Sequence, residues 1–305
     1  MKNLIPLMQR EWLQHRFAWA MLIAVPLALA VLPLSFAEIE FNAEMAGRSA
    51  PDLAALVAMI SIVATTAILF LLVWVTSLFL MSSLARRDHA DRSIEFWLSL
   101  PTGHAESLAV PLLVHLVLVP AAALLAGLLG GYAVSFLMVS RFVGVGEWLA
   151  LPWGALLAGT LSMGVRVIAG LPLATLWLMP LILLAILSNA LFKRWGLPVL
   201  AVALGLGSVV LQRVFGQPIL GELMSALSRG AGLSLAGASG QDMTINERTS
   251  PAQALAEMPA WAAHDLLAAL REAASPLFLG ALVVSAGLFF AVLLWRQRGA
   301  GPSSA

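Results

Sequence analysis

The sequence predicts an all-α membrane protein with six transmembrane helices and both chain ends in the cytoplasm. Of its 305 residues, 61% are hydrophobic and only 11% are charged, whereas about 25% of an ordinary soluble domain is charged. The apolar residues form long blocks, several of them above the roughly 18 residues that mark a membrane-spanning segment. Unpaired backbone groups are too costly in lipid, and the blocks lack the alternation of barrel strands, so the spans are expected to be helices.

Residues 1–16 predict a short amphipathic helix on the membrane surface. Its apolar side chains share one helical face, with Trp12 at the level of the lipid headgroups and Arg16 at its end. The first span follows at 17–36. Ala28-Leu29-Ala30 resembles a signal-peptidase site, but the amphipathic leader is long for a secretory signal peptide.

The remaining apolar runs predict the other spans. The second run contains no charged residue and stops at Arg86-Arg87, and the third contains Gly127, Gly130 and Gly131, which would let another helix approach closely. Lys193-Arg194 predicts a tight cytoplasmic turn between two antiparallel spans. The predicted spans after the first are 53–85, 107–140, 167–192, 196–211 and 276–295.

Hydrophilic segments divide the chain into regions. Spans one to five occupy 17–211, with a cytoplasmic loop at 86–106, and the last span and a short cytoplasmic tail occupy 276–305. The intervening region 212–275 predicts an external loop with two helical stretches around a Gly/Ser-rich middle. Glycine and proline interrupt 147–166, which we interpret as external or partly re-entrant.

The distribution of charge supports this topology. The proposed inner segments contain 10 Lys/Arg and 5 Asp/Glu, whereas the outer ones contain 7 and 11. A seventh span at 147–166 would turn either Lys193-Arg194 or Arg86-Arg87 outward, against the positive-inside bias.

Several chemistries are excluded by missing residues. The chain has no cysteine, and neither of its lysines, Lys2 and Lys193, follows a glycine, so it contains no P-loop and cannot itself be a P-loop ATPase. No metal-binding helix motif or nucleophile elbow is present, and we expect no catalytic residue, metal or cofactor on this chain. His115 lies inside a predicted span, where an interhelical hydrogen bond is the expected role.

The loop 86–106 is the most informative segment. Asp91 or Ser93 can cap a short helix that groups large apolar side chains and closes at Pro101. A plain topological loop with aromatics resting at the interface is the alternative, but such a loop needs neither a capped helix nor the Phe96-Trp97 pair, which suits a docking surface.

Two motifs resemble those of ABC-2 type transporter permeases, a bacterial exporter family. The first is Arg92-Ser93-Ile94-Glu95-Phe96-Trp97-Leu98-Ser99-Leu100-Pro101 after Arg86-Arg87-Asp88, and the second is the leader Arg10-Glu11-Trp12-Leu13-Gln14-His15-Arg16. The family often has a basic residue where Leu98 stands and Ser-Asp where this chain has Gly103-His104.

The resemblance implies a coupling helix that inserts into a separate nucleotide-binding subunit. ATP and Mg²⁺ would bind to that partner, and two permease chains, here a homodimer, would pair in the lipid of the bacterial inner membrane. No nucleic-acid partner is expected. The residues expected to couple to the ATPase are Arg92, Ser93, Ile94, Glu95, Phe96, Trp97 and Leu100.

The second span supplies a possible cavity lining. Ser61, Thr65 and Thr76 fall near one helical face with Trp74 close by, and in the family the corresponding helix lines the central cavity. The alternative is that these hydroxyls bond back to their own helix.

The expected function is therefore an exporter permease that works by alternating access. A secondary transporter or membrane sensor without an ATPase is the alternative, although the spans are nearly free of the ionisable residues that an ion path needs. A membrane enzyme would need clustered acid, base or metal ligands. The outer region holds Asp242, Glu247, His264 and Asp265, which we interpret as a solvated surface, and the cargo stays open.

Overall fold

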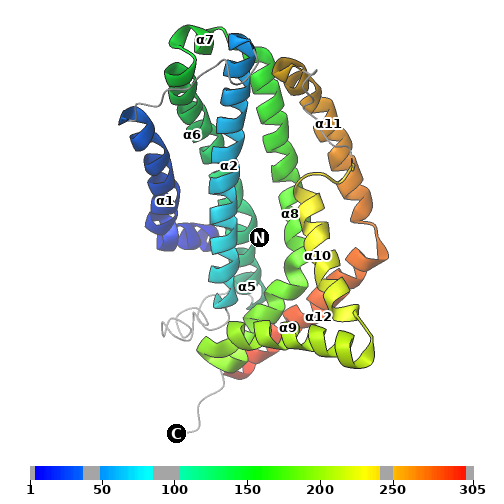
Figure 1. Ribbon diagram of the computed structural model, residues 1–305. Helices are drawn as coiled ribbons and strands as arrows, with labels where there is room; N and C mark the ends of the chain where they lie inside the picture. The colour runs from blue at the N-terminus through cyan, green and yellow to red at the C-terminus, as the bar shows by residue number, and fades with distance from the viewer. Residues whose placement is uncertain (1–3, 37–48, 85–103, 241–249, 300–305) are drawn as a thin grey trace.

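The computed structural model describes residues 4–36, 49–84, 104–240 and 250–299, which form helices and the turns between them. Three long helices stand side by side: α2 (Ala50–Ser82), α6 (Val119–Phe142) and α8 (Trp153–Phe192). Figure 1 shows α1 (Leu4–Phe36) beside α6 and α2 at one edge of this group. The helix α5 (His104–Leu113) runs into α6 through a π-helical turn, η2 (Val114–Leu118).

The described residues contain five stretches that are long and apolar enough to cross a membrane. A multi-pass membrane protein is consistent with these helices, and the all-helical class is as predicted. One stretch joins α8, the 3₁₀ turn η3 (Lys193–Trp195) and α9 (Gly196–Phe215) into 63 residues, and the expected fifth span lies within it. The stretches are Ile5–Leu32, Ala50–Ser82, Ala105–Phe142, Trp153–Phe215 and Pro276–Gln297.

The expected surface helix 1–16 is not separate from the first span. Instead, α1 is one continuous helix from Leu4 to Phe36, and Figure 1 shows its N-terminal turns bent across the rest of it. No glycine, proline or cap residue stands between positions 10 and 20, so nothing ends the helix at that point.

The helix α8 begins earlier than the sequence indicated. It starts at Trp153 and continues without a break to Phe192, so the ambiguous stretch up to Arg166 is its first third rather than a re-entrant loop. Its 40 residues correspond to about 60 Å at 1.5 Å per residue, roughly twice the hydrocarbon thickness of a bilayer. At the usual transmembrane tilt of about 20°, a helix of this length extends beyond the hydrocarbon.

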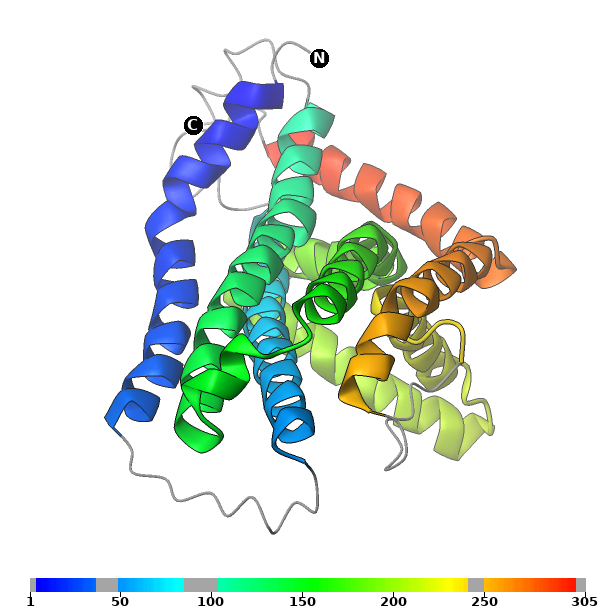
Figure 2. The same ribbon diagram turned by 90° about the horizontal axis from the view of Figure 1, so that it is seen from above.

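The expected antiparallel hairpin of 167–192 and 196–211 is also different. Both views show α9 lying across one end of α8 instead of running back along it (Figures 1 and 2). Side chains at the end of α8 determine this crossing: Ser188 Oγ donates to the Gly196 carbonyl at 2.7 Å, and Asn189 Oδ1 accepts from Leu197 N at 3.1 Å. A Cβ at position 196 would collide with Asn189, so only glycine permits this contact.

The glycines of α6 allow the close packing that the sequence predicted. A Cβ on Gly127 would lie 2.9 Å from Thr66 Cα, and one on Gly131 would lie 2.9 Å from Ile62 Cα. The backbones of α2 and α6 are thus in direct contact. Gly130 faces a different neighbour, Leu27 of α1.

The region 212–275 contains the two expected helical stretches. α10 (Ile219–Leu235) and α11 (Pro251–Glu272) both pack on α8, and α12 (Pro276–Gly299) follows. Ser250 and Gln253 begin α11 with a reciprocal capping box. A short helix, α7 (Val145–Leu149), lies between α6 and α8.

Candidate functional site

The coupling residues lie in 85–103, outside the described residues. This applies to Arg92, Ser93, Ile94, Glu95, Phe96, Trp97 and Leu100. The helices on either side of this segment are described: α2 precedes it and α5 follows it.

The two helices that flank the segment meet in one hydrophobic core with α8 and α12. Met81 and Leu84, at the end of α2, and Leu108, near the start of α5, are at most 2% exposed. They pack with Ile186 of α8 and Val292 of α12 in one cluster. The ends of α2 and α5 that flank 85–103 are therefore packed against both α8 and α12.

Polar contacts reinforce the same end of the bundle. Asn189 Nδ2 of α8 donates to the Ser82 carbonyl at 3.0 Å, which satisfies one of the carbonyls left open at the end of α2. Arg296 Nη1 of α12 donates to Ser107 Oγ of α5 at 3.3 Å, and Arg296 is buried.

The four α2 residues predicted to line a cavity differ in burial and in their contacts. Ser61 is buried and donates to the Val57 carbonyl at 2.7 Å, and Thr76 is exposed and donates to the Leu72 carbonyl at 2.7 Å. Both hydroxyls thus bond back to their own helix. Thr65 is half-buried, and Trp74 is buried against Phe70 with ring centroids 5.8 Å apart.

A cavity of about 230 Å³ does adjoin α2, but on a different set of residues. Its walls come from α2, α6, α8 and α11, and Leu235 of α10 also contributes. Two hydroxyls in the wall bond to backbone carbonyls of their own helices: Thr66 donates to the Ile62 carbonyl, and Thr160 to the Leu156 carbonyl, both at 2.7 Å. The lining is therefore apolar, with Ile62, Phe70, Leu128, Met163 and Met258 among its residues.

A second cavity, of about 440 Å³, lies between α5, η2, α8 and α12. It is also lined almost entirely by apolar side chains, among them Leu113, Met179 and Phe290. Thr175 and Ser285 are its hydroxyl-bearing residues, and each donates to a carbonyl of its own helix, at 2.9 and 2.8 Å. Both cavities would accept apolar groups.

A buried ion pair joins α8 to α11. Arg166 Nη2 lies 2.7 Å from Asp265 Oδ2, and both side chains are fully buried. Arg166 also donates from Nη1 to the Ser234 carbonyl at 2.6 Å and from Nη2 to the Leu233 carbonyl at 3.1 Å. These carbonyls belong to the last turn of α10, where a cation is favourable.

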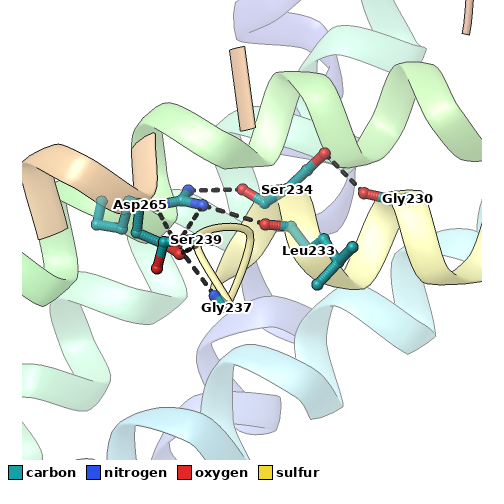
Figure 3. Close-up of polar contacts among 7 residues, drawn as sticks. Gly230, Leu233, Ser234, Gly237, Ser239 and Asp265 are labelled. Atoms are coloured by element: carbon teal, nitrogen blue, oxygen red, sulfur yellow. Dashed lines mark hydrogen bonds and ion pairs between the residues drawn. The ribbon is translucent and has the colours of Figure 1, made fainter. Parts of the chain in front are cut away.

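Asp265 is held by backbone donors as well. Its carboxylate accepts from Gly237 N at 3.0 Å and from Ser239 N at 2.7 Å (Figure 3). Burial by itself raises the pKa of Asp265, but the hydrogen bonds from Ser239 and Arg166 outweigh it, and the pKa is lowered from its ordinary value of 3.8. The carboxylate is therefore charged at neutral pH.

This arrangement corrects the interpretation of Asp265 as a solvated surface residue. Its companion His264 is exposed as expected, while Asp242 and Glu247 lie outside the described residues. The sequence offered one signal that was missed: Arg166 stands in an apolar stretch, where an arginine needs a partner.

Trp12 and Arg16, the two residues singled out in the predicted interfacial helix, are exposed. Trp12 is 52% exposed, and the exposed Arg16 places its guanidinium 4.8 Å from the ring centre of Phe17. Both are open to surrounding lipid or solvent.

His115 makes the interhelical hydrogen bond that the sequence predicted. Its Nε2 lies 3.0 Å from Glu11 Oε2 of α1. His15 completes a group of three residues with metal-ligand chemistry, a group not expected from the sequence. Glu11 and His15 are four positions apart, which was a visible signal, but their proximity to His115 arises only from the packing of α1.

Searches of protein-family models, curated proteins and solved structures found no match for this chain. Its function is therefore argued from its own residues.

Proposed function

We propose that this chain is the transmembrane permease subunit of an ABC-2 type exporter. In this proposal six spans place both chain ends in the cytoplasm, two copies pair in the bacterial inner membrane, and a separate subunit binds and hydrolyses ATP with Mg²⁺. The permease itself performs no hydrolysis.

The observation that carries the proposal is the buried core that the helices on either side of 85–103 share with α8 and α12. The signature around Phe96 and Trp97 lies within the segment 85–103, which α2 precedes and α5 follows. A force applied to the segment by a closing ATPase pair would reach four helices at once. Protein interiors are close-packed and switch between discrete arrangements instead of deforming continuously. Such a force therefore favours rigid-body rocking of the helices, as alternating access requires.

The apolar cavities support cargo of matching chemistry. Both are lined by aliphatic, aromatic and methionine side chains, and the hydroxyls in their walls bond to backbone carbonyls. A lipid or another amphipathic molecule fits this lining better than an ion or a sugar, because a polar cargo would lose its hydration without new partners.

The test is co-purification of the full chain with its cognate ATPase in detergent. We expect Phe96→Ala/Trp97→Ala to reduce both complex formation and stimulation of ATP hydrolysis. Trp195→Ala is the matched control, because Trp195 is 60% exposed in the η3 turn and lies on the same proposed cytoplasmic side. Complex formation and ATPase stimulation equal to wild type in the double variant would refute the proposal.

A secondary transporter is the second candidate, because the described residues include buried ionisable pairs. Glu11 with His115 is the pair that an ion path would use, since Arg166 and Asp265 are saturated by backbone partners. Ion-gradient-driven uptake by the purified chain in liposomes, without any ATPase, would favour this candidate over the exporter.

A further inference from the structure

One face of α1 brings polar side chains into the interior. Glu11, His15 and Trp19 follow one another at intervals of four residues and therefore share a helical face. They meet His115 of η2: the His115 and His15 rings are in edge contact at 5.2 Å between centroids, and the Trp19 ring lies 5.7 Å away.

Burial makes this placement costly. Glu11 is 1% exposed and His115 is 0% exposed, whereas most of the apolar side chains of α1 face outward, as in Phe17 and Met21. An ionisable group in such a position is expensive unless it is paired, and where it occurs in a membrane protein it marks a functional site by default.

The backbone at His115 is specialised. The turn η2 is π-helical, with Val119 N–H bonded to the Val114 carbonyl, and single π-turns occur frequently at functional sites. Pro120 lacks the N–H that would bond the Leu116 carbonyl in a regular helix. Thr175 Oγ1 of α8 lies 3.3 Å from that carbonyl and shares with it the proton that it donates to the Leu171 carbonyl at 2.9 Å.

Two buried nitrogens beside the cluster have no hydrogen-bond partner: Nδ1 of His115 and Nε1 of Trp19. His115 can carry its proton on Nδ1, and its Nε2 lone pair then faces Glu11 and can bind a metal ion. Nε1 of Trp19 is an N–H donor and cannot bind a cation, so the metal ligands come from the glutamate and the two histidines.

We propose that Glu11, His15 and His115 bind one Zn²⁺ ion. One ligand atom from each residue can be chosen so that all three lie within 4.8 Å of one another. Tetrahedral zinc with bonds of about 2.0 to 2.2 Å needs ligand atoms roughly 3.4 Å apart, a difference that small side-chain rotations can close. Two histidines and a glutamate form a known three-ligand zinc set, and imidazole favours zinc over calcium or magnesium.

The bound ion joins two parts of the fold. Glu11 and His15 come from the N-terminal part of α1, and His115 comes from the turn between α5 and α6. Zinc therefore clamps α1, most of whose surface faces outward, onto the interior of the bundle. This inference does not depend on the exporter proposal, because every ligand lies in this one chain.

The test uses the full chain purified with a histidine-free tag, stripped with a chelator and titrated with Zn²⁺ or Co²⁺. We expect one ion per chain, the visible absorption of tetrahedral Co²⁺, and a rise of several degrees in the melting temperature with Zn²⁺. Glu11→Gln and His115→Gln should weaken binding by about 100-fold or more. Loss of a group that only supports a ligand lowers metal affinity by about 10- to 100-fold, and loss of a ligand that touches the metal should cost at least as much.

His264→Gln is the matched control, since it removes an exposed imidazole from α11, and it should bind zinc as the wild type does. If the two buried variants fail to fold, His15→Gln decides, because His15 is only half-buried. Absence of saturable binding to the wild type would overturn the proposal. So would equal affinity in His15→Gln and the wild type, which would place the ion elsewhere.

Discussion

Arg166 and Asp265 are separated by 99 positions, yet their side chains form a fully buried ion pair with 2.7 Å between Nη2 and Oδ2. Arg166 simultaneously binds the last carbonyls of α10. The Arg166 guanidinium thus joins α8, α10 and α11. The segment of α8 that contains it has the composition of a membrane span.

Asp265→Asn should destabilise the protein strongly. The substitution keeps the size of the side chain but leaves Arg166 as an uncompensated buried charge, which costs about 3 to 5 kcal/mol. Chemical unfolding in mixed micelles, followed by tryptophan fluorescence, measures the change. Glu257→Gln, on the exposed face of the same helix, should change stability by less than about 0.5 kcal/mol. Similar effects of the two substitutions would contradict the prediction.

The same ion pair predicts a pH dependence. Because the folded pKa of Asp265 lies below its ordinary value of 3.8, the unfolded chain binds more protons between the two values. The contribution of Asp265 to stability is therefore complete above pH 3.8 and is lost as the pH falls through the lower folded pKa. Melting temperatures of wild type and Asp265→Asn should differ by a constant amount at pH 5 to 7 and converge below about pH 4. A difference that stays constant down to pH 3 would exclude this account.

Gly131→Ala should separate α2 from α6. The new Cβ would lie 2.9 Å from Ile62 Cα and 3.0 Å from its carbonyl oxygen, and backbone atoms cannot move aside alone. We expect a loss of about 1 to 3 kcal/mol, as for other overpacked interiors. Gly280→Ala in α12, where a Cβ meets no atom within 4 Å, should be neutral or slightly stabilising because alanine favours helix. Equal thermal stability of the two variants would disprove the close contact.

Thr175→Val tests the support of the π-turn. The substitution keeps the shape of the side chain but removes the hydroxyl, whose proton goes to the Leu171 carbonyl at 2.9 Å and is shared with the Leu116 carbonyl at 3.3 Å. The Leu116 carbonyl then loses this side-chain contact, at a cost of about 1 kcal/mol. Thr76→Val is the control, because Thr76 is exposed and its hydroxyl bonds only to the Leu72 carbonyl of its own helix. Hydrogen exchange at Val119 should also accelerate in the Thr175 variant alone. Unchanged exchange there would show that Thr175 does not hold the turn.

The helical class and most helix boundaries could be predicted from the sequence because they depend on local patterns. Apolar blocks and the charges that end them predicted the first and last residues of α2 and α12 to within about four positions. The start of α8 was missed, since Gly154, Gly159 and Gly164 resemble loop residues. In the fold Gly159 instead meets Leu255 of α11, so it is a packing position inside a helix.

The candidate site was less predictable, because it depends on how helices pack and not on local sequence patterns. The hydroxyls of α2 were correctly located on a helix, but which of its faces meets a cavity depends on the rotation of α2 against α6, which Gly127 and Gly131 determine. Thr66 rather than Thr65 consequently borders the cavity.

The sequence by itself determined that the chain is helical, that much of it suits lipid, and that a hydrophilic segment separates the second and third long apolar stretches. These properties depend on hydropathy and on the need of each helix to satisfy its own backbone. Only the tertiary structure decided that Arg166 meets Asp265 and that Glu11 and His15 meet His115. Such contacts join residues about a hundred positions apart, and they follow from how the helices pack. A buried charge is destabilising unless packing places an oppositely charged partner beside it.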